Sequence, residues 1–497
     1  MSNIIQTEKV SINPQNAPSN GVYSFKNGYP IIQFLIAQSS KYLVGKSLRL
    51  TGKIKILDAN DTQVKNNNGV GGANAVGGVN ATINEVVGVA STIQQVTLST
   101  LDHQTLEHIR QMPRLLSSIV SATHSSPDLN NGTPIGNLTA SRSIVEACSL
   151  NTERDFSIPI RCGLLTGAGV IPLGQNGTQG MIVQLELSPD NTVLQPVRTV
   201  PAPLTAPYNA TNISGVSGGN TDISQFHYQL SDLQLDFDLL VPDEEGVNAM
   251  ETAANGQLTY NAYSSLYSVV NSSDQQIVLN LGASKVQSVF HNLVPTPHVN
   301  NSAEPSNSLA KFATGGTYNT PVNIDEVAFA KGGILFPLEE RVDVEPKLGE
   351  VAATTQQPAA VGSHLDAKIL EQYLNSVKPI NSLTSTSLSL MSEDNKSTRV
   401  TFADSRIRDD YTEYGVLDNN VIYSEDRWPT TATDPDNHLF GIGIRQDQFK
   451  VGVDYSRSPY SVRIQSGLDG DSPFSLFSYV LATNTLTYSP QGIRVSS

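Results

Sequence analysis

The chain has 497 residues, a net charge of −15 and a charged fraction of only 15%. This length suits two large β domains as well as three ordinary ones, because β-sandwiches of ~200–250 residues often form single units. The first 25 residues carry one lysine and one glutamate, whereas nucleic-acid binders usually present a basic arm or face that neutralises phosphates. We therefore expect no direct sequence-specific binding of nucleic acid.

The cysteines and the hydrophobic pattern indicate the compartment. Cys148 and Cys162 have neither CxxC nor zinc-type spacing, so we expect two buried thiols in a reducing compartment. No apolar run approaches the ~18 residues of a transmembrane helix. Residues 1–20 lack the charged start and apolar core of a signal peptide. The sequence thus predicts a protein made inside a cell, with no transmembrane segment.

In chain order, a polar extended arm at residues 1–24 precedes a series of strands. Residues 48–56 and 181–187 alternate clearly between apolar and polar side chains. Alternation with period two marks strands of a sheet that is buried on one side. Further strands are expected at residues 31–36, 94–98, 156–160 and 226–240.

An acidic turn at residues 241–246 separates this series from a second one. We place the domain boundary there, which gives a first domain at 25–246 and a second at 247–497. We expect the segment 486–495 to be an integral strand of the second domain and not a tail. The other strands expected in this domain are 257–260, 263–270, 276–281, 286–290, 327–338 (two strands around a Gly-Gly turn), 440–444, 450–455, 460–464 and 474–481.

Each half also contains one segment with helical spacing. Leu106 and Ile109 predict a short helix within residues 101–110, and a four-residue apolar period predicts a longer one over 365–377. Both halves therefore follow the same order of strands, a helix-bearing excursion and strands, which favours two copies of one architecture. Long polar loops are expected at 195–219, 296–320 and 402–438, the last of which holds Tyr423 and Trp428 as candidate interface anchors.

Nucleotide and calcium motifs fail at named positions. Gly45-Lys46-Ser47 resembles the end of a phosphate-binding loop, but Ser40 stands where that motif needs glycine, and a strand follows it instead of a helix. A calcium loop could start at Asp434, but Leu439 replaces its glycine and Arg445 replaces its last glutamate. We therefore expect no cofactor and no metal site.

Catalytic groupings are equally weak. His103 and His108 are five residues apart, which does not place two ligands on one helical face, so we interpret them as one partner-bonded and one surface histidine. Asp409 and Asp410 are more typical of a solvated loop than of a site. The sequence therefore predicts a protein that is not an enzyme and has no catalytic residues.

The order of the apolar stretches over nearly the whole chain resembles the major capsid proteins of the double jelly-roll lineage. The resemblance is closest to those of adintoviruses, Polinton-like viruses and virophages. Each stretch is diffuse, and their order carries the resemblance. The matching stretches are 23–36 with the strand at 48–56, then 96–116, 156–187, 226–267, 327–337 and 440–495.

This resemblance implies an all-β fold of two tandem eight-stranded jelly rolls with short helices in loops. It further implies homotrimeric pseudo-hexagonal capsomers in the icosahedral shell of a double-stranded DNA virus. The partners would then be neighbouring capsomers, a penton and minor capsid proteins, and the location would be the virion.

A different class stays open from the residues alone. A β-sandwich glycan-binding protein or glycosidase shares much of this composition. A glycan-binding site needs exposed aromatic side chains, yet aromatic residues make up only 6% and there is one tryptophan. A glycosidase needs two carboxylates ~5–9.5 Å apart, which a sequence does not reveal.

Overall fold

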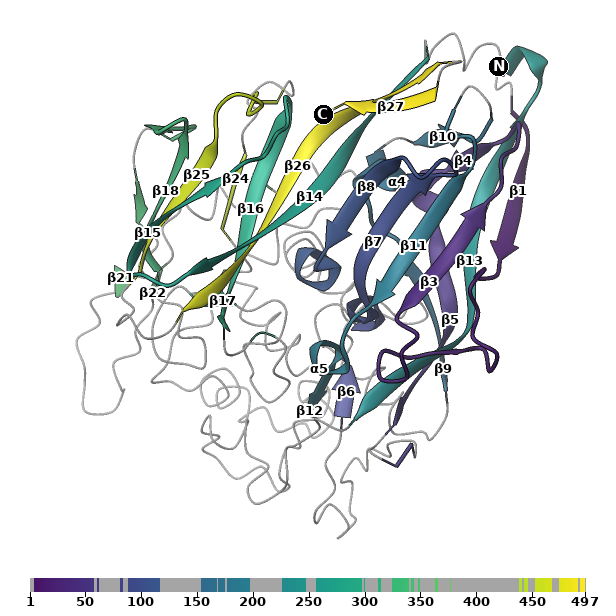
Figure 1. The fold of residues 1–497 in the computed structure, drawn as a ribbon, viewed down its shortest axis with the longest axis horizontal. Coiled ribbons are helices and arrows are strands. Elements are labelled where there is room, and N and C mark those ends of the chain that lie inside the picture. The colour runs from purple at the N-terminus through teal and green to yellow at the C-terminus, as the bar shows by residue number, and fades with distance from the viewer. Residues whose placement is uncertain are drawn as a thin grey trace, which may run out of the picture.

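The structure is a computed structural model in which three main sheets form two barrels. Figure 1 shows the barrels side by side, with the first at the right and the second at the left. The described residues are 4–57, 60–61, 81–83, 88–116, 153–167, 169–174, 177–196, 226–246, 256–296, 299, 312–313, 324–338, 341–343, 347–348, 363–364, 376, 438–439, 442–445, 452–466, 473–489 and 492–496.

A seven-stranded sheet forms the outer wall of the first barrel. Its path is β10-β4-β13-β5-β9, and β1 and β2 also pair with β13. The polar arm expected at residues 1–24 contains β1, which runs antiparallel to the second half of β13. The strands are β1 (Ile4–Ile12), β2 (Val22–Tyr23), β4 (Tyr42–Val44), β5 (Arg49–Leu57), β9 (Arg154–Pro159), β10 (Val170–Pro172) and β13 (His227–Pro242).

A nine-stranded sheet runs through both barrels. Its path is β24-β16-β26-β14-β8-β7-β11-β3, and β27 also pairs with β26. β14 and β8 meet in a parallel contact at Ser264 and His108, and this contact is where the barrels join. The strands are β3 (Ile31–Ile36), β7 (Ile93–Thr100), β8 (Thr105–Arg110), β11 (Met181–Leu187), β14 (Gln257–Val270), β16 (Val286–Pro295), β24 (Ile442–Arg445), β26 (Phe474–Ser489) and β27 (Gly492–Ser496).

A five-stranded sheet completes the second barrel. Its path is β15-β25-β18-β19, with β20 also paired to β18. These strands are β15 (Asp274–Leu279), β18 (Ile324–Lys331), β19 (Ile334–Leu335), β20 (Val342–Asp343) and β25 (Tyr460–Ser466). Three two-stranded pairs are β6 (Ala81–Ile83) with β12 (Leu194–Pro196), β17 (Phe312–Ala313) with β23 (His438–Leu439), and β21 (Lys347–Leu348) with β22 (Ser363–His364).

Strand β26 contributes to two separate cores. Phe477 and Tyr479 belong to the first core, which fills the first barrel and the junction. Leu476 and Val480 belong to the second core, inside the second barrel. Successive side chains of a strand point to opposite faces, so this strand is buried on both sides and ties the two cores together.

Most of the strands expected from the sequence are confirmed. The two clearest alternations correspond to β5 and β11, and the expected Gly-Gly hairpin is formed by β18 and β19. The stretches 257–260 and 263–270 form one continuous strand, β14. Residues 486–489 end β26 and residues 492–495 lie in β27, so the segment belongs to a sheet as expected. Its Leu486 and Ile493 pack in the first core, however, and not in the core of the second barrel, which corrects the expected assignment. Of the strand expected at 450–455, the described part holds only an isolated bridge at Val453.

The helix expected within residues 101–110 is wrong. Residues 105–110 are strand β8, and a helical turn follows only at 112–116. Leu106 and Ile109 point to opposite faces of this strand and are both buried, so β8 is covered on both faces. A spacing of three on a strand buried on both faces imitates a helical period. The helix expected at 365–377 lies outside the described residues except for Ser376, which is helical.

Candidate assembly surface and the inter-barrel junction

Glu107 on β8 joins three elements at the junction between the barrels. Its carboxylate accepts hydrogen bonds from the backbone N–H groups of Gly163 (2.9 Å) and Leu164 (2.8 Å), at the start of α4 (Gly163–Gly167), and of Tyr263 (2.8 Å) on β14. Burial raises the pKa of Glu107 to about 7, and the three N–H donors oppose this shift because they stabilise the charged form. With 3% exposure, this carboxylate holds backbone together and is closed to a substrate.

Tyrosine hydroxyl groups add further links across the same junction. Tyr260 on β14 donates to the carbonyl oxygen of Leu106 at 2.8 Å. Tyr479 on β26 donates to the carbonyl oxygen of Gln111 at 2.9 Å. Both hydroxyls satisfy backbone groups of the first barrel from strands of the second, so the barrels are connected by specific hydrogen bonds as well as by apolar packing.

A buried arginine also crosses the junction. Arg114, in the helical turn 112–116, is 1% exposed and places its guanidinium 4.7 Å from the centre of the Phe477 ring. Its Nη1 lies 3.5 Å from the amide oxygen of Asn292 on β16. Burial lowers the pKa of Arg114 to about 10. A guanidinium over an aromatic face is an attractive arrangement, and here it connects the first barrel to two strands of the second.

The phosphate-loop fragment is part of the framework. Gly45 begins a 3-10 turn, η1 (Gly45–Ser47), and a side chain there would meet the carbonyl oxygen of Leu165 at 2.1 Å. The Ser47 hydroxyl donates to the carbonyl oxygen of Val44 at 2.6 Å and accepts from the N–H of Asp238 at 2.8 Å. Close packing and turn closure therefore explain this glycine and serine without a nucleotide.

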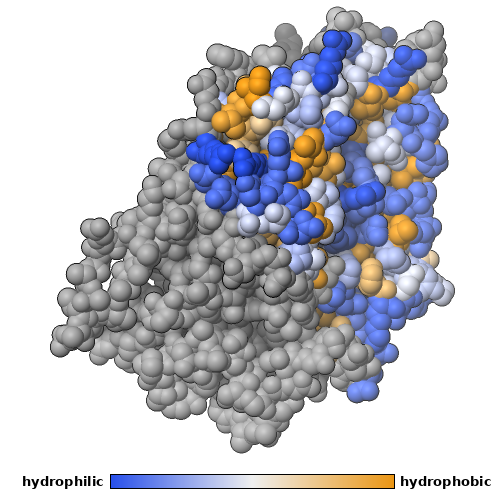
Figure 2. Space-filling model, turned by 60° about the vertical axis from the view of Figure 1, so that its left-hand side comes forward, coloured by the Kyte–Doolittle hydropathy of each residue, from blue (hydrophilic) through white to orange (hydrophobic). Residues whose placement is uncertain are grey.

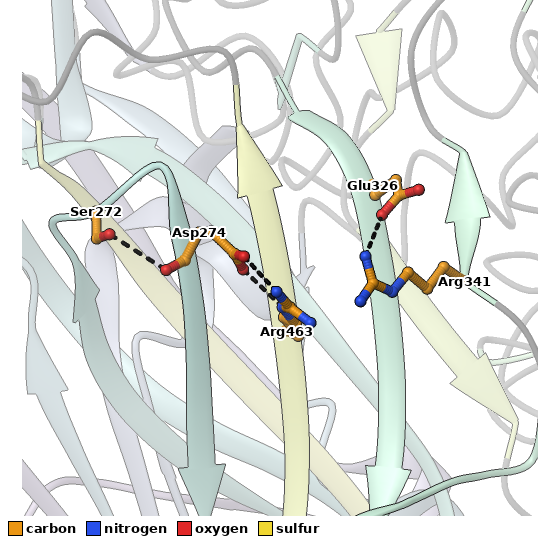
Figure 3. Close-up of polar contacts among 5 residues, drawn as sticks. All are labelled: Ser272, Asp274, Glu326, Arg341 and Arg463. Carbon is orange, nitrogen blue, oxygen red and sulfur yellow. Dashed lines mark hydrogen bonds and ion pairs between the residues drawn. The ribbon is translucent and has the colours of Figure 1, made fainter.

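Four charged side chains form an ion-pair row on the outer face of the five-stranded sheet (Figure 3). Asp274 on β15 binds both Nε, at 2.6 Å, and Nη2 of Arg463 on β25. Arg341 donates to Glu326 on β18 at 3.1 Å. The hydrogen bonds from Arg463 lower the pKa of Asp274, and Asp274 in turn raises the pKa of Arg463. The row is formed within one chain and remains partly exposed, with side-chain exposures between 37% and 45%.

Apolar and small side chains occupy the next row of the same face. Val278 on β15 is 60% exposed and Leu335 on β19 is 36% exposed. Between them in register lie Ser461 and Ala330. Figure 2 brings this side of the molecule forward and shows a mostly hydrophilic described surface with hydrophobic residues in separate spots. Ser461 and Ala330 are themselves buried, so the exposed part of this face is the ion-pair row with Val278 and Leu335 beside it. We treat this exposed part as the candidate assembly surface.

His103 and His108, the two histidines considered from the sequence, have different surroundings. His108 has Nδ1 2.9 Å from the Thr97 hydroxyl, and its Nε2 accepts from Nε of Arg110 at 3.0 Å. His103 is exposed in the turn before β8, with a positive φ of 61°. The interpretation as one partner-bonded and one surface histidine is confirmed.

The remaining sequence candidates divide between framework residues and residues outside the described ranges. Leu439 ends strand β23 and Arg445 ends strand β24. Cys162 is a free buried thiol, as expected, and burial raises its pKa. Outside the described ranges lie Cys148, Asp409, Asp410, Tyr423, Asp434, Trp428 and most of the three polar loops.

Among the described residues, no group of three or more histidine, cysteine, aspartate or glutamate side chains is placed to hold a metal ion. In the same part of the chain, no helix has the length and apolar character needed to cross a membrane.

Sequence reasoning missed both Glu107 and the ion-pair row. A lone glutamate between apolar Leu106 and Ile109 was a usable signal, but it was hidden by the helical interpretation of that segment. The four residues of the row come from strand regions that are up to 189 positions apart in sequence, and only the register of the sheet brings them together.

Two jelly-roll barrels that share one sheet define an all-β protein of the double jelly-roll class. The chain is similar to a chain in the structure of the Sputnik virophage, with a TM-score of 0.52, 8% identity, and coverage of 100% of this chain and 89% of that one. It is also similar to the Faustovirus major capsid protein (TM-score 0.49, 11% identity, 97% and 90% covered) and the mavirus major capsid protein (TM-score 0.43, 9% identity, 98% and 90% covered).

These likenesses are structural. At 8% identity the Sputnik likeness shows the fold, and at that level it confirms the resemblance seen in the sequence. No model of a known protein family matches the chain, and no curated protein matches it by sequence.

Proposed function

We propose that this chain is a structural capsid protein of an icosahedral double-stranded DNA virus and has no enzymatic activity. The observation that carries the proposal is the double barrel. One nine-stranded sheet runs through both barrels, and hydrogen bonds to Glu107 link them at the junction. Two barrels joined through one sheet suit the tile of a shell, and a chain in the structure of the Sputnik virophage has a similar fold.

The proposed assembly unit is a homotrimer. Three double barrels present six similar barrels around one axis, which makes a pseudo-hexagonal capsomer that tiles a shell. Its first jelly roll is residues 25–246 and its second is 247–497, with residues 1–24 as an arm. Neighbouring capsomers, a penton and minor capsid proteins are the further partners, and we propose no sequence-specific contact with nucleic acid.

Observations on the described residues weigh against the glycosidase and glycan-binding alternatives. Glu107 has the raised pKa of a catalytic acid, but its oxygens are occupied by backbone donors in the interior. The exposed aromatic side chains are also dispersed: Phe25 and Tyr29 lie in the connection between β2 and β3, while Tyr267 on β14 leans on Phe477 with ring centres 5.2 Å apart. Neither arrangement offers a sugar a flat platform or a carboxylate pair.

Light scattering coupled to gel filtration tests the proposal. Three chains of 53.3 kDa give a species of about 160 kDa, and electron microscopy under assembly conditions should show shells or hexagonal sheets. Obligate interfaces commonly bury more than ~2,000 Å², so the trimer should persist on dilution. A stable monomer at high protein concentration, with no larger species, would overturn the capsid proposal and favour the glycan-binding alternative.

A further inference from the structure

The second barrel contains a buried histidine that bridges its two sheets. His291 on β16 is 1% exposed. Its Nδ1 lies 2.8 Å from the hydroxyl of Ser478 on β26, in the same sheet. Its Nε2 lies 2.9 Å from the hydroxyl of Tyr460 on β25, in the facing five-stranded sheet. The imidazole thus completes a hydrogen-bonded connection through the interior of the barrel.

We propose that His291 makes the second barrel acid-sensitive, so that uptake of a proton by this imidazole separates the two sheets while the first barrel stays closed. This inference concerns the folded chain and is independent of the proposed capsid role.

The surroundings of His291 offer little to stabilise a positive charge. Both hydrogen-bonding partners are hydroxyl groups, and Tyr460 packs edge-on against Tyr455 with ring centres 5.9 Å apart. Two charged groups lie beyond these rings. One is another cation, Lys331, whose Nζ lies 5.4 Å from the centre of the Tyr455 ring. The other is the exposed carboxylate of Asp454, whose pKa is lowered by hydrogen bonds from Ser456 and also by Lys331. No carboxylate hydrogen-bonds to His291 among the described residues. A buried charge without an opposite partner is costly.

The direction of the pH effect follows from this burial. Desolvation lowers the pKa of His291 to about 3 from an ordinary 6.5. The folded barrel therefore keeps the imidazole neutral, while an opened barrel takes up a proton below about pH 6.5. The stability of the closed barrel that depends on neutral His291 is fully present above pH 6.5 and is lost progressively as the pH falls toward 3. Between pH 7 and pH 5 the population of opened barrels should rise by roughly 25-fold.

The first barrel also contains a buried histidine, but that histidine has an acidic partner. His227 on β13 is fully buried, and its Nε2 lies 3.0 Å from a carboxylate oxygen of Asp61. Lys26 approaches its Nδ1 at 3.3 Å. A carboxylate at this distance offsets part of the cost of a positive charge on His227. Among the described residues, no carboxylate hydrogen-bonds to His291. This difference is why we expect acid to act on one barrel and not on both.

Hydrogen exchange followed by mass spectrometry on the full chain tests the proposal. Exchange is measured at pH 7 and pH 5 and corrected for the intrinsic effect of pH on the exchange rate. Peptides from β15, β18 and β25 should lose protection by roughly 25-fold at pH 5. Peptides from β5 and β13 in the first barrel are the internal reference and should change by much less.

Two substitutions separate titration from hydrogen bonding. His291→Gln keeps a polar side chain but cannot titrate, so the ratio of protection between pH 7 and pH 5 should become nearly flat. Tyr460→Phe removes one hydrogen bond but leaves the imidazole, so protection should fall at both pH values while the ratio persists. His108→Gln, on a half-buried histidine, is the matched control and should respond as the unmodified chain does.

The comparison between variants also removes the contribution of Glu107. The pKa of Glu107 is raised from 4.5 to about 7 in the folded chain. This carboxyl therefore stabilises the fold fully below pH 4.5, and the stabilisation is lost as the pH rises through about 7. It is present in every variant and cancels in the difference. Equal loss of protection in both barrels, or an unchanged acid response in His291→Gln, would refute the proposal. If His291→Gln does not fold, a flat pH ratio for Tyr460→Phe would refute it as well.

Discussion

The backbone N–H of Tyr263 donates to the carboxylate of Glu107 at 2.8 Å, and this contact joins a strand of the second barrel to a strand of the first. Direct pairing between these strands is limited to one parallel contact, Ser264 with His108. A side chain therefore supplies the hydrogen bonds that the sheet does not supply at this point. The same carboxylate also holds the start of α4, so this one residue links three elements at the junction.

Replacing Glu107 should destabilise the chain strongly. Glu107→Ala leaves three buried backbone N–H groups without their acceptor, and each such loss costs about 1–3 kcal/mol. We expect the free energy of unfolding to fall by about 3 kcal/mol or more. Glu107→Gln retains one acceptor oxygen, so its free energy of unfolding should lie between those of the unmodified chain and Glu107→Ala. Chemical denaturation measures this free energy for all three proteins.

The matched control for this prediction is Glu186→Ala on β11, a partly exposed glutamate of the same sheet. Substitutions at such positions usually change stability by less than about 0.5 kcal/mol. Equal effects of Glu107→Ala and Glu186→Ala would show that the junction does not depend on the buried carboxylate.

Two glycines of α4 provide a second test of the junction. A side chain at Gly163 would meet the carbonyl oxygen of Asn261 at 2.0 Å, whereas one at Gly167 meets only the N of Asn261 at 3.6 Å. Gly163→Ala must push α4 away from β14, and overpacking of this kind costs about 1–3 kcal/mol. Gly167→Ala should be nearly neutral. The melting temperatures of the two variants test this prediction. An unchanged melting temperature for Gly163→Ala would mean that α4 can shift away from β14 at no cost.

The ion-pair row should matter for assembly more than for folding. Exposed ion pairs contribute little to stability, and the like charges that Arg463→Glu places beside Asp274 cost only about 0.2–1 kcal/mol. The melting temperature of the chain should therefore fall only slightly. If the outer face of the five-stranded sheet contacts a neighbour, the same change should slow or abolish the formation of shells and sheets. Lys53→Glu on β5 breaks an exposed pair with Asp232 on a different sheet and is the control. Normal assembly of Arg463→Glu would exclude this face as an interface.

Local patterns predicted more of the strands than of their connections. Met181 to Leu187 alternate because β11 has one strongly buried face, and the sequence alone predicted this strand. The same reasoning failed for β8, since a strand covered on both sides has no period of two to recognise. The site was harder still, because Glu107 and Tyr263 are 156 positions apart. Their contact depends on how two barrels meet, which no local pattern records.

The C-terminal hairpin provides the last prediction, that deletion of residues 486–497 leaves the chain insoluble or unfolded. Leu486 is fully buried in the first core and pairs with Leu258 on β14. Ile493 on β27 is 8% exposed and belongs to the same core. Burying each such side chain is worth about 1.5–3 kcal/mol, and the total stability of a domain is only about 5–15 kcal/mol. Deletion also removes the residues of β26 that pair with Gln257 and Leu258 at the start of β14.

A shorter deletion separates the two strands of this hairpin. Removal of residues 492–497 takes away β27 and Ile493 but keeps Leu486 and the pairing of β26 with β14. This variant should stay soluble with a lowered melting temperature, whereas the longer deletion should not. Arg494→Ala, at an exposed position of β27, should match the full chain. A soluble 486–497 deletion with an unchanged melting profile would show that the hairpin is a dispensable tail.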